Sequence, residues 1–90
     1  MHMSVQVQQT PNPNARKFIL PNRRFERSMN FPDAEAARNH PLATKLFKVE
    51  GVYNVFFAQD FVTVNKVPAV NWDVIEPTIL SILSEELNGH

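Results

Sequence analysis

The sequence has no cysteine in its 90 residues, and this absence excludes several kinds of chemistry. Without thiols the chain has no disulfide, no cysteine nucleophile and no metal site built on thiolates. A cysteine-free sequence fits a reducing compartment, and the first residues carry neither a secretory signal nor an arginine-rich transit peptide. These features predict a cytoplasmic protein whose own residues hold no metal and no cofactor.

Glycine is nearly as rare, since Gly51 and Gly89 are the only two. Two isolated glycines cannot build a glycine-rich phosphate loop, and Gly51 suits the left-handed residue that follows a helix. No apolar stretch approaches the roughly 20 residues of a membrane helix. Nine basic and nine acidic residues cancel, whereas nucleic-acid-binding domains are usually strongly basic. We therefore expect no membrane partner and no nucleic-acid partner.

Side chains that could carry catalysis are few and scattered. No serine lies in a nucleophile elbow. His2 and His90 lie at the chain ends, and His40 alone cannot form a metal site. The acidic residues show no sign of a pair held in two different environments, which acid–base catalysis needs. The sequence thus predicts no catalytic residue and no metal ligand, and we expect a protein that is not an enzyme.

Hydrophobic spacing, broken by seven prolines, predicts the order β-β-β-α-α-β-β-α. Strands joined by short connections and interrupted by helices are typical of α+β domains. The sequence predicts one domain over residues 1–90 with two layers, a mostly antiparallel sheet of about five strands and helices on one face. We expect strands at 4–9, 16–20, 25–29, 52–57 and 61–66, and helices at 33–38, 41–49 and 71–87.

Prolines also bear on where the helices begin. Pro41 suits the first helical position, with Asn39 or His40 as the cap. Pro77 fits poorly in a last helix capped at Asn71, because it removes one backbone hydrogen bond. Either this helix begins later, or it is kinked at the proline.

Four aromatic residues, Tyr53, Phe56, Phe57 and Phe61, cluster in the two strands expected after Gly51. Aromatic side chains on a sheet can stack on RNA bases. Because arginine and lysine are not interleaved with them, we expect these aromatic side chains to pack in the core.

The segment from Thr10 to Phe18 is the most unusual part of the sequence. Two prolines stiffen it, and its asparagines favour turns. It ends in Arg16 and Lys17, within the first 48 residues, which carry a balance of +5 against −5 for the rest. A rigid turn explains the segment, but a stiff polar loop also costs little entropy to dock. The uneven charge indicates either solvated faces or a basic patch that meets an acidic partner.

Three blocks of the sequence form a recognisable pattern. The first is Thr10-Pro11-Asn12-Pro13-Asn14-Ala15-Arg16-Lys17-Phe18. The second comprises Pro41-Leu42-Ala43, Leu46-Phe47, Glu50-Gly51-Val52, Val55-Phe56-Phe57 and Asp60-Phe61-Val62-Thr63-Val64. The third is Trp72 with Pro77 and the amphipathic helix after it. Together these blocks, which run over most of the chain, resemble the Nfu/NifU-like N-terminal domain, whose opening motif is TPNP-x-x-x-KF.

The resemblance implies a role around iron–sulfur cluster biogenesis. In two-domain relatives this domain precedes a second one, whose Cys-x-x-Cys pair holds the cluster. A chain without cysteine cannot carry the cluster on thiolates, so it is either a free-standing version or a fragment of a longer protein. It is then an accessory interaction module in cluster assembly or delivery, and its partner is an iron–sulfur cluster carrier or an apo-target protein. The alternative is a small-ligand-binding or regulatory domain with a pocket between sheet and helices.

The resemblance also favours the binding interpretation of the loop. Pro11, Pro13, Lys17 and Phe18 match the family pattern by position, although Phe18 belongs to the core as the start of an apolar strand. The expected partner-binding surface combines this loop with the arginines that follow it. Its residues are Thr10, Pro11, Asn12, Pro13, Asn14, Arg16, Lys17, Arg23, Arg24 and Arg27.

Overall fold

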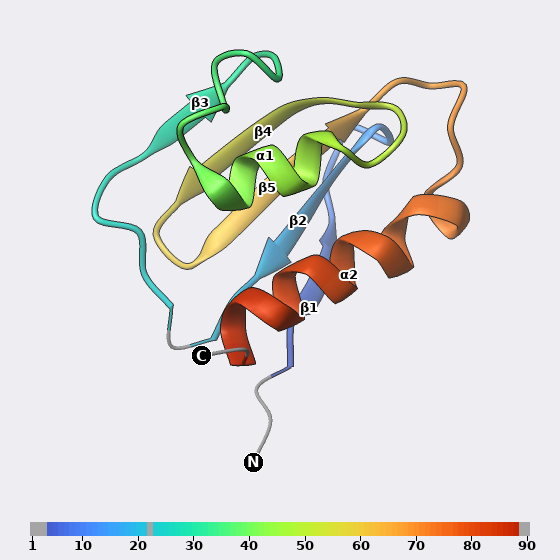
Figure 1. Cartoon of the computed structure of the whole chain (residues 1–90). Helices are drawn as coiled ribbons and strands as arrows, with labels where there is room; N and C mark the ends of the chain where they lie inside the picture. Colours follow the sequence, from blue (N-terminus) through green and yellow to red (C-terminus); the bar gives the residue numbers. More distant parts are fainter. Residues whose placement is uncertain (1–3, 22, 89–90) are drawn as a thin grey trace.

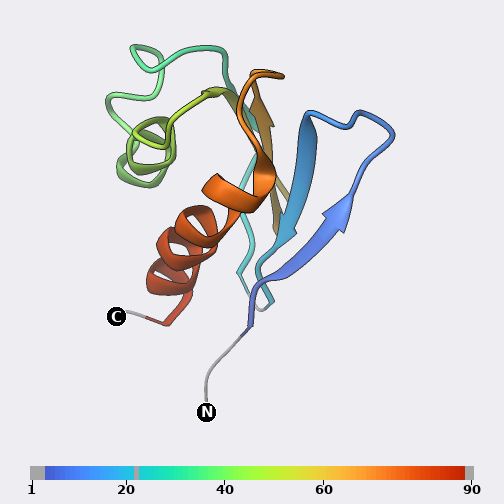
Figure 2. The same ribbon diagram turned by 90° about the vertical axis from the view of Figure 1, so that its right-hand side faces the viewer.

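The computed structural model describes residues 4–21 and 23–88, which form one antiparallel sheet covered on one face by two helices (Figure 1). The strands lie in the order β1-β2-β5-β4-β3, and a view turned by 90° shows both helices on the same side (Figure 2). The expected two-layer α+β fold with a five-stranded sheet is confirmed. In chain order the elements are β1 (Gln6–Gln9), β2 (Ala15–Ile19), β3 (Met29–Phe31), α1 (Pro41–Phe47), β4 (Val52–Ala58), β5 (Phe61–Lys66) and α2 (Trp72–Asn88).

Alternate residues of the central strands point towards the helices and form the core. In β2, β4 and β5 the fully buried side chains are Phe18, Val55, Phe57, Val62 and Val64. The helices face them with an apolar stripe at helical spacing, whose buried members include Leu42, Leu46, Ile75, Ile79 and Leu83. Because burying one such side chain contributes about 1.5–3 kcal/mol, this contact between the layers holds the helices on the sheet.

The helix expected at 33–38 does not form, and the segment makes successive turns instead. Its backbone hydrogen bonds span three residues, as from Ala37 N to Ala34 O at 3.2 Å. Within the segment only Ala37 is buried, so too little apolar surface is available to stabilise so short a helix. The order of elements is therefore β-β-β-α-β-β-α.

The third strand lies at Met29–Phe31 and not at the expected 25–29. Phe25 N donates to Gln59 O at 2.7 Å, and the Phe25 ring stacks on Phe57 with 4.8 Å between centroids. Phe25 therefore enters the core from a loop that closes over the β4–β5 hairpin, and regular pairing begins only after it.

The first residues of α1 match the expectation. Pro41 is the first helical residue, and the cap is His40, whose Nδ1 accepts a hydrogen bond from Ala43 N at 3.3 Å. The His40 ring also packs on Phe31 and Phe57, with centroids 5.3 and 4.9 Å away. Since Nδ1 must be unprotonated to accept, this geometry requires the neutral imidazole.

The long helix α2 begins at Trp72, where Asn71 Oδ1 accepts from Asp73 N at 2.8 Å. Pro77 lies inside the helix and is exposed. Having no N–H, it leaves the carbonyl of Asp73 without its helical partner, a loss that solvent at this exposed position can offset. The helix begins at Trp72, five residues before Pro77, because the Trp72 side chain reaches into the core from the first turn.

Two described residues have positive φ. Gly51, at φ 85°, follows α1 as expected, and Gln59, at φ 51°, opens the turn between β4 and β5. Because Ala58 pairs with Phe61, this hairpin loop is the two residues Gln59 and Asp60, one fewer than the expected three. A non-glycine residue thus takes the left-handed position that hairpins of this kind usually give to glycine.

Single substitutions at Gly51 and at Gln59 should change the stability of the protein in opposite directions. Gly51→Ala should lower the free energy of unfolding by about 1–3 kcal/mol, because φ is positive and the added Cβ would lie 2.5 Å from Val70 Cγ2. Gln59→Gly should raise it by roughly 0.5–1 kcal/mol, because glycine adopts this conformation without steric cost. Urea unfolding measures both, and a Gly51→Ala protein as stable as the wild type would contradict the strained geometry.

His40 should make stability depend on pH. Burial lowers the pKa of the ring below its ordinary 6.5, with a smaller raising effect from Glu86 and a smaller lowering effect from Arg23. The folded state therefore takes up its proton at lower pH than the unfolded chain. The contribution of His40 is complete above about pH 6.5 and is lost as pH falls through the folded pKa.

Urea unfolding at several pH values between about 5 and 8 measures this loss. In His40→Asn the amide oxygen can still cap α1 but does not titrate, so its stability should fall less below about pH 6.5. Equal pH profiles for wild type and variant would show that another group is responsible.

Candidate functional site

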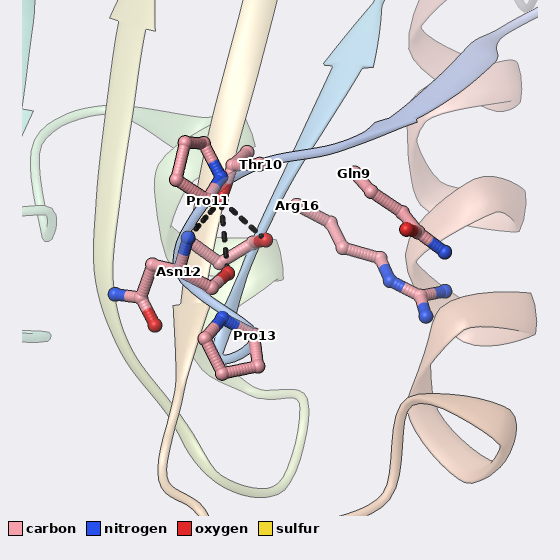
Figure 3. A pocket seen from close by; sticks show the side chains of 7 residues that line it. Gln9, Thr10, Pro11, Asn12, Pro13 and Arg16 are labelled. Carbon is pink, nitrogen blue, oxygen red and sulfur yellow. Dashed lines mark hydrogen bonds between the residues drawn. The ribbon is translucent and has the colours of Figure 1, made fainter.

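The loop between β1 and β2, residues 10–14, is held in one shape by its own hydrogen bonds (Figure 3). Thr10 Oγ1 accepts from Asn12 N at 3.1 Å and lies 2.9 and 3.1 Å from the carbonyl oxygens of Asn12 and Ala15. Asn12 Oδ1 accepts from Asn14 N at 2.9 Å. Side chains of Thr and Asn thus satisfy the backbone where the prolines leave no donors. We call residues 10–14 the proline loop.

Residues far along the chain anchor the proline loop to the rest of the fold. Trp72 Nε1 donates to Pro13 O at 2.9 Å. Lys66 donates twice to Asn14, from its backbone N to the carbonyl at 2.9 Å and from Nζ to Oδ1 at 3.1 Å. Both anchoring side chains are buried, Lys66 with 5% exposure. The loop is therefore fixed by its own bonds and by the connection from β5 to α2, while Pro11, Asn12 and Pro13 stay exposed.

Two arginines of the expected surface form ion pairs within the chain. Arg16 pairs with Glu76 and lies over the Trp72 ring, with 5.0 Å from Cζ to the centroid. Arg23 pairs with Glu86 at 2.9 Å. Basic residues of the first half thus meet acidic residues near the two ends of α2. Part of the charge asymmetry in the sequence therefore serves the contact between sheet and helix.

The expected surface is also divided in space. The proline loop lies at one end of β2, while the chain carrying Arg23, Arg24 and Arg27 leaves the other end (Figures 1 and 2). Lys17 belongs to neither group, because its Nζ lies 4.2 Å from the centroid of Phe61 and Phe61 does not belong to the core. The structure brings the loop and Arg16 together, and it keeps the three later arginines apart from them.

A shallow hollow of about 240 Å³ opens beside the proline loop and is lined by residues 9–13, 15 and 16 (Figure 3). A second hollow of about 300 Å³ is lined by residues 66 and 68–72. Neither lies between the sheet and the helices, where the alternative small-ligand interpretation expects its pocket. In the part of the chain that the structure describes, no three histidine, aspartate or glutamate side chains gather as metal ligands.

No helix within residues 4–21 and 23–88 is both long and apolar enough to cross a membrane.

The four aromatic side chains expected to pack in the core do not all do so. Phe57 is fully buried, but Tyr53 is 48% exposed, and Phe56 and Phe61 are only partly buried. Placing all four in the core is therefore wrong for three of them, because β4 and β5 have a second face that the helices do not cover.

These features define a small α+β domain whose distinctive part is an anchored, exposed loop. The family model described as "Scaffold protein Nfu/NifU N terminal" matches residues 5–90, and the chain belongs to this family. The resemblance seen in the sequence is confirmed. The family is one of scaffold-protein domains.

Curated relatives and solved structures agree with this assignment. Over 86 residues the chain is 43% identical to the human "NFU1 iron-sulfur cluster scaffold homolog, mitochondrial", covering 93% of this chain and 34% of the relative. It is 38% identical over 84 residues to "NifU-like protein 5, mitochondrial" of Arabidopsis thaliana, covering 92% and 30%. The solution structure of a NifU-like protein from Saccharomyces cerevisiae superposes with a TM-score of 0.85 at 29% identity, covering 99% of this chain and 82% of that one.

The chain spans about a third of the length of these curated relatives. The expectation of a cytoplasmic protein is wrong on this comparison, because the relatives from human, Drosophila willistoni and Arabidopsis are mitochondrial. That expectation rested on missing cysteine and missing leader features. Such features describe the residues of this domain and do not distinguish one reducing compartment from another.

Trp72→Phe should loosen the proline loop while leaving the core packed. The variant keeps an aromatic ring but loses the N–H that bonds Pro13 O and part of the buried ring, so the free energy of unfolding should fall by about 1–3 kcal/mol. Amide hydrogen exchange at Asn12 and Asn14 should speed up more than exchange in β4 and β5. Val74→Ala, at a 68% exposed position of α2, is the matched control. Unchanged exchange in the loop would show that the indole N–H does not hold it.

Proposed function

We propose that this domain is an accessory docking module in iron–sulfur cluster assembly or delivery, and that it does not itself carry the cluster. Two findings support a role in iron–sulfur cluster assembly or delivery: membership of the Nfu/NifU N-terminal family and similarity to an iron–sulfur cluster scaffold homologue. The observation that carries the docking role is the proline loop, which is exposed at Pro11, Asn12 and Pro13 yet fixed by its own hydrogen bonds.

A fixed loop is suited to binding because little conformational entropy remains to be lost on association. Its exposed atoms are proline rings and an asparagine side chain, and the hollow beside it offers a concave contact. Arg16 borders this hollow but is engaged with Glu76, so it contributes mainly the flat face of its guanidinium. The contact is therefore one of shape and hydrogen bonding more than of net charge.

The chain contributes no thiolates, so the cluster stays on the partner throughout. Docking then raises the effective concentration of a cluster carrier near its apo-target, or holds the two in a productive orientation. No bond is made or broken by this domain, and it acts as a binding protein and not as an enzyme. Arg24 and Arg27 are exposed and form a second candidate contact, at the other end of β2.

Amide NMR of isotope-labelled protein, titrated with a separate Cys-x-x-Cys cluster-carrier domain, tests the proposal. We expect shifts concentrated on the proline loop and Arg16, with both apo and cluster-loaded carrier. Pro11→Glu places charge and bulk on the exposed surface of the loop and should weaken binding by about tenfold, or 1.4 kcal/mol. Pro32→Glu makes the same change at an exposed proline near the opposite sheet edge and should bind like the wild type.

The arginines are tested separately. Arg24→Glu combined with Arg27→Glu should weaken binding and reduce its dependence on salt if these side chains contact an acidic partner. Unchanged affinity and salt dependence would remove the arginines from the contact and leave the loop as the site. A titration without any shifts would exclude the carrier as a direct partner.

A further inference from the structure

The face of the sheet that the helices do not cover has a distinctive composition. Both helices lie on the other side, as the turned view shows (Figure 2). Strand register places one outward-facing residue from each strand in a row across this face. The row consists of Gln8, Lys17, Thr63, Phe56 and Asn30. We call the outward-facing side of the five strands the open face.

An irregularity in β4 adds a further aromatic residue to the open face. Val52 packs against the core and Val55 belongs to it, although a regular strand would turn residues three apart to opposite faces. The register with β5 shifts between Val52 and Asn54, which accommodates the extra residue. Asn54 and Tyr53 both point away from the core as a result, and Tyr53 is 48% exposed.

Three aromatic side chains therefore occupy this side of the hairpin. Phe56 and Phe61 pack against each other with 6.3 Å between centroids, and Lys17 Nζ lies 4.2 Å from the centroid of Phe61. Tyr53 stands at the end of the hairpin farther from the turn, beside Asn54. Tyrosine and phenylalanine are enriched where proteins bind one another, because they bury much area with few rotatable bonds.

The charge on the open face has a single sign. The structure describes all five strands, and among their outward positions Lys17 is the one charged residue. The other cations of β2 and β5, Arg16 and Lys66, turn to the helix side and contact Trp72 there. Besides the aromatic rings and aliphatic side chains such as Ile19, the outward positions carry the amides of glutamine and asparagine and the hydroxyl of Thr63, which offer hydrogen bonds without negative charge.

We propose that the open face binds a protein segment in which an acidic residue stands next to an apolar side chain. The apolar side chain packs among the aromatic rings, and the carboxylate pairs with Lys17, whose stem already lies on Phe61. Single-stranded RNA is the other partner that an aromatic sheet face suggests. One cation is too few for it, because phosphate backbones need several lysines or arginines. The open face is separate from both the proline loop and the exposed arginines Arg24 and Arg27, and binding there goes beyond the proposed function.

Selection of random peptides of about 12 residues, displayed on phage, tests the open face directly. We expect selected peptides to contain aspartate or glutamate beside leucine, isoleucine or an aromatic residue. As synthetic peptides they should shift amide signals of Lys17, Phe56 and Phe61. Lys17→Glu at a partly exposed position and Tyr53→Ser at an exposed one should each weaken binding at least fivefold.

The controls separate this surface from the loop and from nucleic acid. Lys45→Glu makes the same charge reversal on an exposed position of α1 and should leave peptide binding unchanged. Pro11→Glu should also leave it unchanged, so failure here does not bear on the proposed function. Peptides without acidic enrichment, or affinities insensitive to Lys17→Glu and Tyr53→Ser, would overturn the inference. Oligouridylate binding at these residues without peptide binding would overturn it in favour of RNA.

Discussion

The Trp72 side chain is the contact on which the arrangement of this domain depends. It stands at the first residue of α2 and reaches the proline loop through its bond to Pro13 O at 2.9 Å. Its ring lies 6.5 Å from Phe18 of β2, centroid to centroid, and the cations of Arg16 and Lys66 lie 5.0 and 5.6 Å from its centroid. One indole thus joins the helix, the sheet and the loop, and the direction of α2 and the shape of the loop are set together.

Lys66 shows how this arrangement tolerates a buried charge. Within the described residues no carboxylate lies within ion-pair distance of its ammonium group. Burying a cation is costly unless dipoles replace water. Here Asn14 Oδ1 and the Val67 carbonyl accept from Nζ, and the Trp72 ring lies 5.6 Å away. Asn14 belongs to the proline loop and Trp72 to α2. The ammonium group therefore keeps all three contacts only while both the loop and the helix are packed against it.

The ion pairs near the two ends of α2 orient the helix and add little to stability. Arg16–Glu76 and Arg23–Glu86 are partly exposed, with side chains 21–36% accessible. Such pairs contribute roughly 0–1 kcal/mol each, far less than the burial of Ile79 or Leu83. Their value lies in orientation, since each fixes one end of the helix over β2 and the segment after it.

Most of the helices and strands can be predicted from the sequence because they depend on local signals. Alternation predicts four of the five strands but misplaces β3, expected at 25–29 and found at Met29–Phe31, and Pro41 with His40 predicts the start of α1. The 33–38 segment misleads because propensity and capping favour a helix that has no apolar stripe to bury. The aromatic residues mislead for two reasons. Phe56 and Phe61 face outward by ordinary alternation with the buried Val55, Phe57 and Val62, and the sequence does not show that the helices leave this face of the sheet uncovered. Tyr53 faces outward because of the extra residue in β4, which no local signal marks.

The candidate site could be located from the sequence only in part. The proline loop stands out through its composition, and the structure keeps it exposed and fixed. The ion pairs of Arg16 and Arg23 join residues 60 and 63 positions apart, so the sequence could not show that these cations already have partners. A basic patch inferred from counting charges therefore overstates what is available to another protein.

This use of charge within the fold explains what kind of recognition remains open to the domain. Arg16, Arg23 and Lys66 hold sheet, helix and loop together. The surfaces left for a partner present mostly the prolines and amides of the proline loop and, on the opposite side of the sheet, the amides and half-buried aromatic rings of the open face, which contribute through fit and desolvation. Fit of that kind requires a surface that does not rearrange, and the hydrogen bonds around Trp72 and Lys66 supply that rigidity at the loop. The same contacts that fold the domain therefore determine how it can recognise a partner.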